Sequence, residues 1–289
     1  MESTWAWDET LFGGSARYYR AGRLPYSPEI ARALQEELGL DGTGRLLDVG
    51  CGTGEIALLL APLYGEVVGL DADEEMIEEA RAEAERQGRS NTRWVTARAE
   101  ELPLDLGTFR TATFAQSFHW MDRERVAATV REMLEPGGAW VHVDTKTHLG
   151  APTDEPLSRP QPPRAEIDAL VEEYLGPVKR AGQGSLPHGT PSGEDEIMVA
   201  AGFEGPLRRF IAGGRVIERS EDEVVASVFS VTSSAPHLFG ARLSEFENDL
   251  RAILRRVSPD GRFCAVSNPT QLIIWPRPEV PAQDLRPAQ

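Results

Sequence analysis

Residues 46–55, LLDVGCGTGE, place three glycines between an apolar run and a helical run, IALLLAPL. Glycine lowers the stability of strands and helices, so repeated glycines indicate a tight turn or a close approach of the backbone to a ligand. A strand, a glycine-rich turn and a helix N-terminus together form a typical site for a nucleotide-like ligand. We therefore expect such a ligand at Gly50, Gly52 and Gly54.

Two acidic residues narrow the class of ligand. The dinucleotide pattern G-x-G-x-x-G requires glycine at position 55, where this chain has Glu55. An acid beside a helix N-terminus disfavours a pyrophosphate, so a dehydrogenase is disfavoured. Asp71 follows the next apolar run, roughly 20 residues beyond the loop, where an acid can hold ribose hydroxyls. A ligand with a ribose and no phosphates is favoured, and S-adenosylmethionine fits that description.

The elements that must position these residues alternate between helix and strand from 28 to 145. Short apolar runs joined by amphipathic helices predict parallel strands with crossover helices. We expect helices over 28–39, 55–64, 74–88 and 123–138, and strands over 45–50, 66–71, 92–97, 111–118 and 139–145.

The remainder of the chain changes character after residue 145. A proline-rich stretch is followed by an expected helix over 165–176, a loop over 182–193 and a helix over 194–203. Further on we expect a strand-like run over 208–218, helices over 221–231 and 241–257, and a strand over 270–276. We divide the chain into an N-terminal lid (1–27), a ligand-binding core (28–145), a cap inserted into it (146–205), C-terminal elements that complete the sheet and substrate pocket (206–278) and a tail (279–289).

Composition excludes several classes of partner. A net charge of −16 and a pI near 4.8 disfavour nucleic acid and anionic membrane surfaces, and solubility alone is the favoured interpretation of this acidity. The sequence contains no run of 18 apolar residues, so we expect no transmembrane helix. We also expect no signal peptide. Cys51 and Cys264 lie far apart, which favours a cytoplasmic location and argues against a disulfide framework or a structural metal.

Several motifs, over most of residues 14–145, resemble those of the class I S-adenosylmethionine-dependent methyltransferases. LLDVGCGTGEIA is similar to their first motif and VVGLDADEEMIEEAR to their second. ARAEELP resembles the third, and FAQSFHWMD with MLEPGG resembles the fourth motif and the turn before strand five. ARYYRAGRLPYSP is similar to the N-terminal lid of the small-molecule group typified by trans-aconitate and ubiquinone-type methyltransferases. The resemblance implies a Rossmann-like α/β fold: a mostly parallel seven-stranded sheet with helices on both faces and a helical cap insertion.

The resemblance also implies roles for particular residues. Asp48 would organise the loop and the amino group of S-adenosylmethionine, while Gly50 and Gly52 admit its methionine portion. The ribose would be held by Asp71, and Arg23 would pair with the carboxylate. The other implied cofactor-binding residues are Tyr19, Ala72, Met76, Ala99, Glu100, Ala115 and Gln116.

Two positions depart from the family pattern. Arg98 stands in the third motif where the family often has an aspartate that accepts an adenine amino hydrogen, so this acceptance would fall to a backbone carbonyl or to Glu100. Arg110 replaces the usual aspartate of the Phe-Asp pair before strand four.

Other side chains leave two interpretations open. His119, after strand four, is a candidate general base or a wall of the pocket, and Trp120 and His237 are candidate substrate contacts. His142 and Asp144 lie two residues apart and so on one face of the expected strand over 139–145. We expect them to be packed and hydrogen-bonded rather than catalytic. Three serines, Ser230, Ser233 and Ser234, could either line the substrate pocket or cap a helix. We expect Arg164, Lys179 and Arg180 to lie on the solvated surface rather than to contact an anionic acceptor.

The favoured function is methyl transfer to a small-molecule acceptor, by a monomer or homodimer. The alternatives are an S-adenosylmethionine-binding enzyme with other chemistry, such as a cyclase, or a non-catalytic binding protein.

Overall fold

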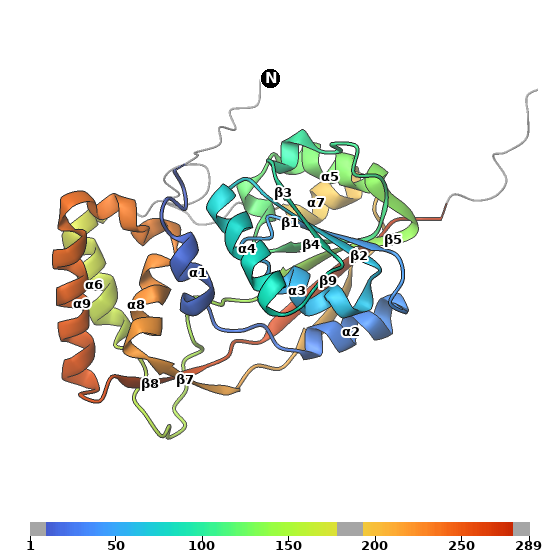
Figure 1. Ribbon diagram of the computed structural model, residues 1–289. Coiled ribbons are helices and arrows are strands. Elements are labelled where there is room, and N and C mark those ends of the chain that lie inside the picture. The colour runs from blue at the N-terminus through green and yellow to red at the C-terminus, as the bar shows by residue number, and fades with distance from the viewer. Residues whose placement is uncertain (1–9, 178–192, 280–289) are drawn as a thin grey trace, which may run out of the picture.

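At the centre of the computed structural model lies a twisted sheet, and the structure describes residues 10–177 and 193–279 (Figure 1). Its strands are β1 Arg45–Val49, β2 Glu66–Asp71, β3 Thr92–Thr96, β4 Phe109–Ala115, β5 Leu134–Asp144, β6 Leu207–Ile211 and β9 Thr270–Pro276. The order across the sheet is β3-β2-β1-β4-β5-β9-β6. The pairs among β1 to β5 are parallel, and β9 runs antiparallel to both of its neighbours. The expected mostly parallel seven-stranded sheet is confirmed.

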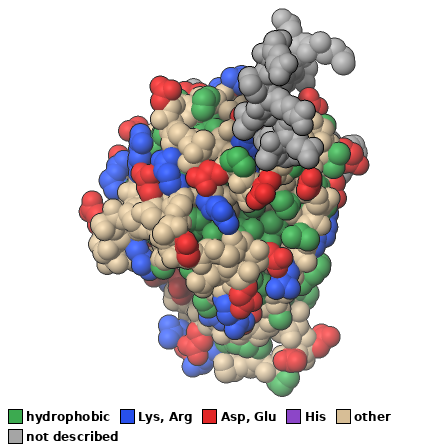
Figure 2. All heavy atoms as spheres, turned by 90° about the vertical axis from the view of Figure 1, so that its right-hand side faces the viewer, with side chains coloured by type: hydrophobic (Ala, Val, Ile, Leu, Met, Phe, Trp, Pro, Cys, Tyr) green, Lys and Arg blue, Asp and Glu red, His purple; other side chains and the backbone are tan. Residues whose placement is uncertain are grey.

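The exterior carries charges of both signs. On the face seen in Figure 2, which is the right-hand side of Figure 1, acidic and basic side chains are interspersed with apolar ones. Among the described residues, no single helix is long and apolar enough to cross a membrane, and one bent pair, Glu221–Phe229 with Thr232–Val257, passes by length and composition only.

Helices cover both faces of the sheet because the strands bury side chains on both sides. Along β1, Leu46 packs into one apolar cluster while Leu47 and Val49 pack into the other. The first cluster includes α2 (Glu29–Leu38) and α3 (Glu55–Leu60); the second includes α5 (Arg123–Met133) and α7 (Glu194–Ala200). α4 (Glu74–Arg86) packs against β2 and β3. Short 3-10 turns are η1 Ala61–Leu63, η2 Ala99–Glu101 and η3 Phe118–Trp120.

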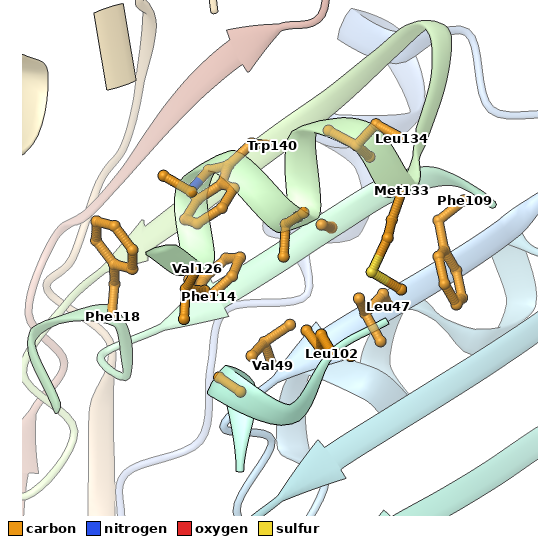
Figure 3. Packing of buried hydrophobic residues seen from close by; sticks show 14 of the residues in the cluster. Leu47, Val49, Leu102, Phe109, Phe114, Phe118, Val126, Met133, Leu134 and Trp140 are labelled. Atoms are coloured by element: carbon orange, nitrogen blue, oxygen red, sulfur yellow. The ribbon is translucent and has the colours of Figure 1, made fainter. Parts of the chain in front are cut away.

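Aromatic packing fixes the end of β4 and the turn that follows it. Phe114 stacks on Trp140 with ring centroids 3.7 Å apart, and Phe118 meets the same indole edge-on at 5.0 Å (Figure 3). The indole Nε1 of Trp140 donates to Nε2 of His142 at 2.9 Å. His142 is therefore a packed and hydrogen-bonded core residue, as favoured from the sequence, and Asp144 is exposed.

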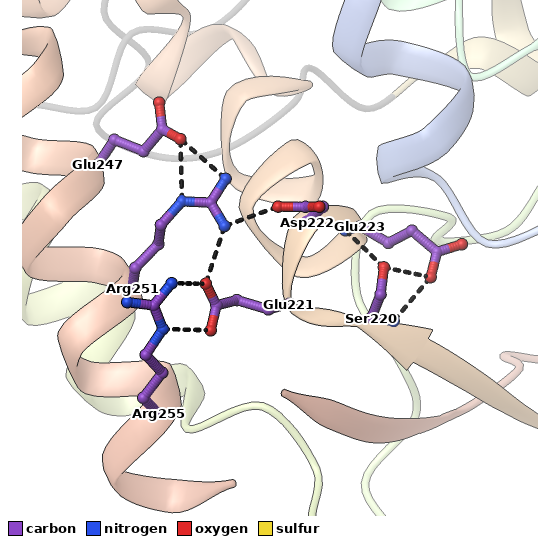
Figure 4. Close-up of polar contacts among 7 residues, drawn as sticks. All are labelled: Ser220, Glu221, Asp222, Glu223, Glu247, Arg251 and Arg255. Atoms are coloured by element: carbon purple, nitrogen blue, oxygen red, sulfur yellow. Dashed lines mark hydrogen bonds and ion pairs between the residues drawn. The ribbon is translucent and has the colours of Figure 1, made fainter. Parts of the chain in front are cut away.

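A second unit of helices lies beside the sheet, on the left of Figure 1. Its elements are α6 Arg164–Leu175, β7 Val216–Ser220, α8 Glu221–Phe229, η4 Thr232–Ser234, η5 Pro236–Arg242, α9 Leu243–Val257 and β8 Arg262–Val266. α6, α8 and α9 share one apolar cluster. Arg251 of α9 donates to Glu221, Asp222 and Glu247, and Arg255 also pairs with Glu221, so the charges join α9 to the start of α8 (Figure 4).

The strand-like run expected over 208–218 is two strands in two different sheets. β6 pairs with β9 and β7 pairs with β8. Between them, a Cβ on Gly213 would lie 2.4 Å from the carbonyl oxygen of Ser267, so only glycine allows the chain to cross there.

The parts that the sequence assigned to a cap are distributed over both units. α7 packs against α5 of the sheet unit, whereas α6 packs against α9. The boundaries of the cap stay a prediction. The loop expected over 182–193, apart from Gly193, and most of the tail lie outside the described residues.

Candidate functional site

The glycine-rich loop follows β1, and its three glycines have left-handed backbone conformations. The φ angles are +67° at Gly50, +54° at Gly52 and +83° at Gly54. A Cβ on Gly50 would lie 2.5 Å from Cβ of Ser117, and one on Gly54 would lie 2.7 Å from the ring of Trp94. A Cβ on Gly52 would meet only the ring of Tyr19, at 3.6 Å. Protein packing therefore requires glycine at 50 and 54, while Gly52 keeps open the space beneath Tyr19.

Two carboxyl groups hold this loop, Asp48 fully buried and Asp71 partly buried at the edge of the pocket. Asp48 accepts from the Thr113 hydroxyl at 2.7 Å and from N–H of Ala57 in α3 at 3.1 Å. Asp71 accepts from N–H of Gly52 at 2.8 Å and from N–H of Asp73 at 3.0 Å. Burial raises the pKa of Asp48 to about 7 and that of Asp71 to about 6. Asp48 thus ties the loop to α3, and Asp71 ties it to the end of β2.

A pocket of about 660 Å³ opens at the carboxyl ends of β1, β2 and β4. This is the edge at which ligands bind in open parallel sheets. Most of the predicted cofactor residues line it: Tyr19, Gly50, Gly52, Asp71, Ala72, Met76, Ala99, Glu100, Ala115 and Gln116. The candidate substrate contact Trp120 lines it as well. The structure therefore brings together residues that lie up to 101 positions apart in the chain (Tyr19 to Trp120).

Helix α1 (Ala16–Gly22) covers this pocket. Arg20 donates to the carbonyl oxygen of Thr53 and lies 3.5 Å from Glu55 and 3.8 Å from Glu83 of α4. These contacts hold α1 over the glycine loop. Behind it, α1 packs against α8 so closely that a Cβ on Gly22 would lie 2.4 Å from the carbonyl oxygen of Ala226. The expected lid is thus wedged between the loop and the helical unit.

A smaller pocket of about 360 Å³ adjoins the glycine loop, and Arg23 and Asp48 line it together with Tyr19, Gly50 and Gly52. Arg23 donates to the carbonyl oxygen of Ser230 at 2.5 Å and to the Thr147 hydroxyl at 3.4 Å, and its guanidinium lies 4.3 Å from the ring centroid of Tyr19. Its Nε is buried without a hydrogen-bond partner in the described part of the chain. A buried cationic donor in a pocket suits a carboxylate.

Arg98, one of the two departures from the family pattern, lines the larger pocket beside Glu100. Its Nε lies 3.6 Å from Oε2 of Glu100, and Oε1 of Glu100 accepts from N–H of Asp122 at 2.8 Å. Arg110, the other departure, is remote from it, because its guanidinium donates to the carbonyl oxygen of Leu38 at 3.1 Å.

His119 does not line either pocket, although its neighbour Trp120 does. Burial, followed by the charge of Arg123, lowers the pKa of His119 to about 4, so its ring is neutral at pH 7. Gln116 has a positive φ of 56° and donates to Asp144 at 2.8 Å. His237 is exposed and contacts the carbonyl oxygen of Gly13 at 3.0 Å, away from both pockets.

Several lining residues of the larger pocket were not predicted from the sequence: Phe12, Leu70, Ala97, Ser117 and Met121. Phe12 precedes α1 and packs edge-on against Tyr19 and Trp120, with centroids 6.2 Å and 5.8 Å away. No motif marks it; only the path of the chain over the pocket does. Ser117 donates to the carbonyl oxygen of Val49 at 2.6 Å and thereby joins β4 to the glycine loop. No group of three potential metal ligands occurs within residues 10–177 and 193–279.

Comparison with known proteins defines the class. Residues 46–138 match the family described as a methyltransferase domain. The uncharacterized methyltransferase YcgJ of Bacillus subtilis is 30% identical over 138 residues, which are 47% of this chain and 54% of that protein. The ubiquinone/menaquinone biosynthesis C-methyltransferase UbiE of Geobacter sp. is 34% identical over 146 residues, 47% of this chain and 62% of that protein. The crystal structure of YcgJ matches 88% of this chain and all of that one, with a TM-score of 0.51 and 18% identity.

Residues 46–138 therefore match a methyltransferase domain, and the sheet that contains them has the Rossmann-like methyltransferase fold. S-adenosylmethionine is the cofactor of this class, as expected from the sequence. The chain spans about half the length of the first curated relatives that it matches.

Proposed function

We propose that this protein transfers a methyl group from S-adenosylmethionine to a small-molecule acceptor. The observation that carries the proposal is the pocket at the carboxyl ends of β1, β2 and β4, where Asp71 and N–H of Gly52 are joined beneath Tyr19. Most of the residues that line this pocket lie within residues 46–138, which match a methyltransferase domain. UbiE is described by name as a C-methyltransferase of quinone biosynthesis, which supports a small molecule as the acceptor.

The residues present fit the cofactor part by part. Asp71 would accept hydrogen bonds from the ribose hydroxyls, because its carboxylate oxygens retain lone pairs beyond the two backbone bonds that they accept. In the smaller pocket, the buried Nε of Arg23 would meet the methionine carboxylate, and Asp48 would lie near the amino group. This assignment gives a hydrogen-bond partner to a donor that otherwise has none among the described residues.

The adenine would lie between the start of α4 and η2. Ala72 and Met76 provide apolar contacts on one side, and Ala99 provides them on the other. Glu100 provides acceptor oxygens and Arg98 provides donors at this end, so we propose that the pair replaces the aspartate of the family pattern.

When bound, the cofactor supplies an activated methyl group on a sulfonium. The work of this chain is then to position the two reactants and to exclude water, which can lower the barrier by several kcal/mol. Tyr19, Phe12 and Trp120 form an aromatic cover over the pocket, and aromatic faces also favour a cation. A general base at His119 stays a prediction, and its low pKa favours orientation without a base.

The test is release of S-adenosylhomocysteine from protein mixed with S-adenosylmethionine and a panel of acids, phenols and amines. At least one acceptor should give turnover that depends on the enzyme. Gly52→Val should abolish it, because valine at φ +54° would be strained and would fill the space beneath Tyr19. Circular dichroism must show that the variant is folded.

Binding of the cofactor without product from any acceptor would favour the alternatives, a non-methylating enzyme or a binding protein. A wild-type protein that does not bind the cofactor by calorimetry would contradict the proposal itself. The cytoplasmic location and the choice between monomer and homodimer stay predictions.

A further inference from the structure

The helical unit contains a separate cavity of about 820 Å³, counted with the solvent space at its mouth, between α6, the end of α8, η4 and the segment at His148. None of the residues assigned to cofactor binding lines it. Its lining combines an apolar wall with a few charged groups, which is the composition of a small-molecule site.

One end of the cavity carries the cationic guanidinium of Arg164, although the whole chain carries −16. Arg164 and His148 line this end, and a nitrogen of the guanidinium donates to the carbonyl oxygen of His148 at 3.4 Å. Burial, together with the neighbouring charges of Arg23, Arg164 and Lys146, lowers the pKa of His148 to about 4. Burial also lowers the pKa of Arg164, against the opposing effect of Asp168. The guanidinium charge is thus poorly solvated and incompletely neutralised.

The rest of the cavity restricts the kind of anion. Ile167, Val171 and Val228 form an apolar wall that suits a hydrocarbon body. Asp168 and Glu172 are exposed on the same helix and also line the cavity. Their negative charges would repel a second anionic group, so the lining favours a ligand with one anionic group, placed at Arg164.

The charged end adjoins the smaller pocket beneath the lid. Thr147 lines that pocket, and the next residue, His148, lines the cavity. Arg23 bridges the same region, because it donates to Thr147 and to the carbonyl oxygen of Ser230. A ligand in the cavity would therefore lie across one segment of backbone from the proposed methionine end of the cofactor.

We propose that this cavity binds an apolar organic monoacid whose carboxylate pairs with Arg164, at a site separate from the cofactor pockets. The ion pair would be partly buried, where a guanidinium and a carboxylate form two charge-assisted hydrogen bonds. The sequence favoured solvated surface for Arg164, whereas the structure places it in the wall of the cavity. Lys179 and Arg180 lie outside the described residues.

Binding is tested with 2-naphthoate and its neutral amide, 2-naphthamide, titrated into the full chain by calorimetry without cofactor. The acid should bind at least roughly tenfold more tightly than the amide, as expected for a hydrogen-bonded charge pair. Arg164→Met should remove this difference, and Arg164→Lys should restore part of it. Arg159→Met is the matched control, because Arg159 pairs with Asp260 on the surface of the same unit and does not line the cavity.

Equal affinity for acid and amide, a difference that survives Arg164→Met, or no binding at millimolar concentration would each overturn the anion site. Arg164→Met should leave affinity for S-adenosylmethionine unchanged, because none of the residues assigned to cofactor binding lines the cavity. Failure of the cofactor to bind wild-type protein would instead contradict the proposed function and would leave the naphthoate result standing.

Discussion

Burial decides the charge of three histidines in this protein. The pKa values of His119 and His148 are lowered to about 4, and that of His142 is lowered to about 3. All three rings are therefore neutral at pH 7. An unburied histidine would titrate near the ordinary value of about 6.5. The sequence did not predict this difference, because sequence alone does not show how deeply a side chain is buried.

For His119, this predicts a small effect of substitution. His119→Gln should change turnover by less than about threefold and should leave the pH–rate profile between pH 5.5 and 8 unchanged, because no histidine proton is lost or gained there. The measurement is kcat and kcat/KM against pH for wild type and variant. A loss greater than about a hundredfold, with the acid limb of the profile removed, would instead identify His119 as the general base.

For His142, the same physics predicts a pH-dependent stability. Its pKa is about 3 in the folded chain and about 6.5 when unfolded, so below pH 6.5 the unfolded state binds the extra proton. This residue therefore destabilises the fold progressively as the pH falls from 6.5 toward 3. His142→Phe removes the titration. Between pH 7 and pH 5, the free energy of unfolding of the variant should gain up to about 2 kcal/mol relative to wild type.

Urea unfolding at the two pH values measures that difference. Phenylalanine also removes the hydrogen bond from Trp140, which changes the stability of the variant at both pH values. The informative quantity is therefore how the stability difference between variant and wild type changes from pH 7 to pH 5. A variant whose difference from wild type is the same at both pH values would show that His142 does not titrate as described.

At the scale of elements, the glycine loop depends on helix α1, which is far from it in the sequence. Arg20 ties α1 to the loop at Thr53 and Glu55 and to α4 at Glu83. Tyr19 lies on the same helix and covers Gly52. The position of the lid is therefore set by contacts of a neighbouring residue that does not itself line the pocket.

Arg20→Met should weaken S-adenosylmethionine binding by roughly three- to tenfold, because α1 loses its ties to the loop although no residue that lines the pocket is substituted. Hydrogen exchange of the α1 amides should become faster in the same variant. Arg17→Met is the control, since Arg17 is exposed and stacks over Tyr18. Equal effects of the two substitutions would indicate a general loss of charge rather than a loosened lid.

The sequence predicted the elements of the sheet well where hydrophobic period and glycine position agree. The strands expected over 45–50 and 66–71 are examples. It failed at 208–218, because the pattern of one strand cannot show that Gly213 passes within contact of Ser267 and sends the chain into another sheet. The helix expected over 123–138 ends at Met133 for a similar reason, since β5 already begins at Leu134 and pairs with Phe109.

At the scale of the whole molecule, the proposed methyl transfer belongs to the pockets at the edge of the sheet, and the helical unit contains a separate cavity. Motifs of the sheet unit predicted most of the larger pocket, because the carboxyl ends of parallel strands meet at one edge. The cavity of the helical unit had no motif, and it depends on the packing of α6 with α8 and α9, which only the structure shows. We propose that residues 216–266 belong with α6 to the cap, and that α7 belongs to the core.

The central claim is that Asp71 holds the ribose of S-adenosylmethionine at the end of β2. Calorimetric titration of the cofactor into wild type, Asp71→Ala and Asp73→Ala tests it most directly. Asp73 is the matched acid, because it caps α4 by accepting from N–H of Met76 at 3.2 Å and does not line the pocket. Asp71→Ala should weaken binding by about 1.5–3 kcal/mol. Asp73→Ala should lower stability by about 1 kcal/mol and leave affinity nearly unchanged. Normal affinity in Asp71→Ala, with binding lost in Asp73→Ala, would contradict the account.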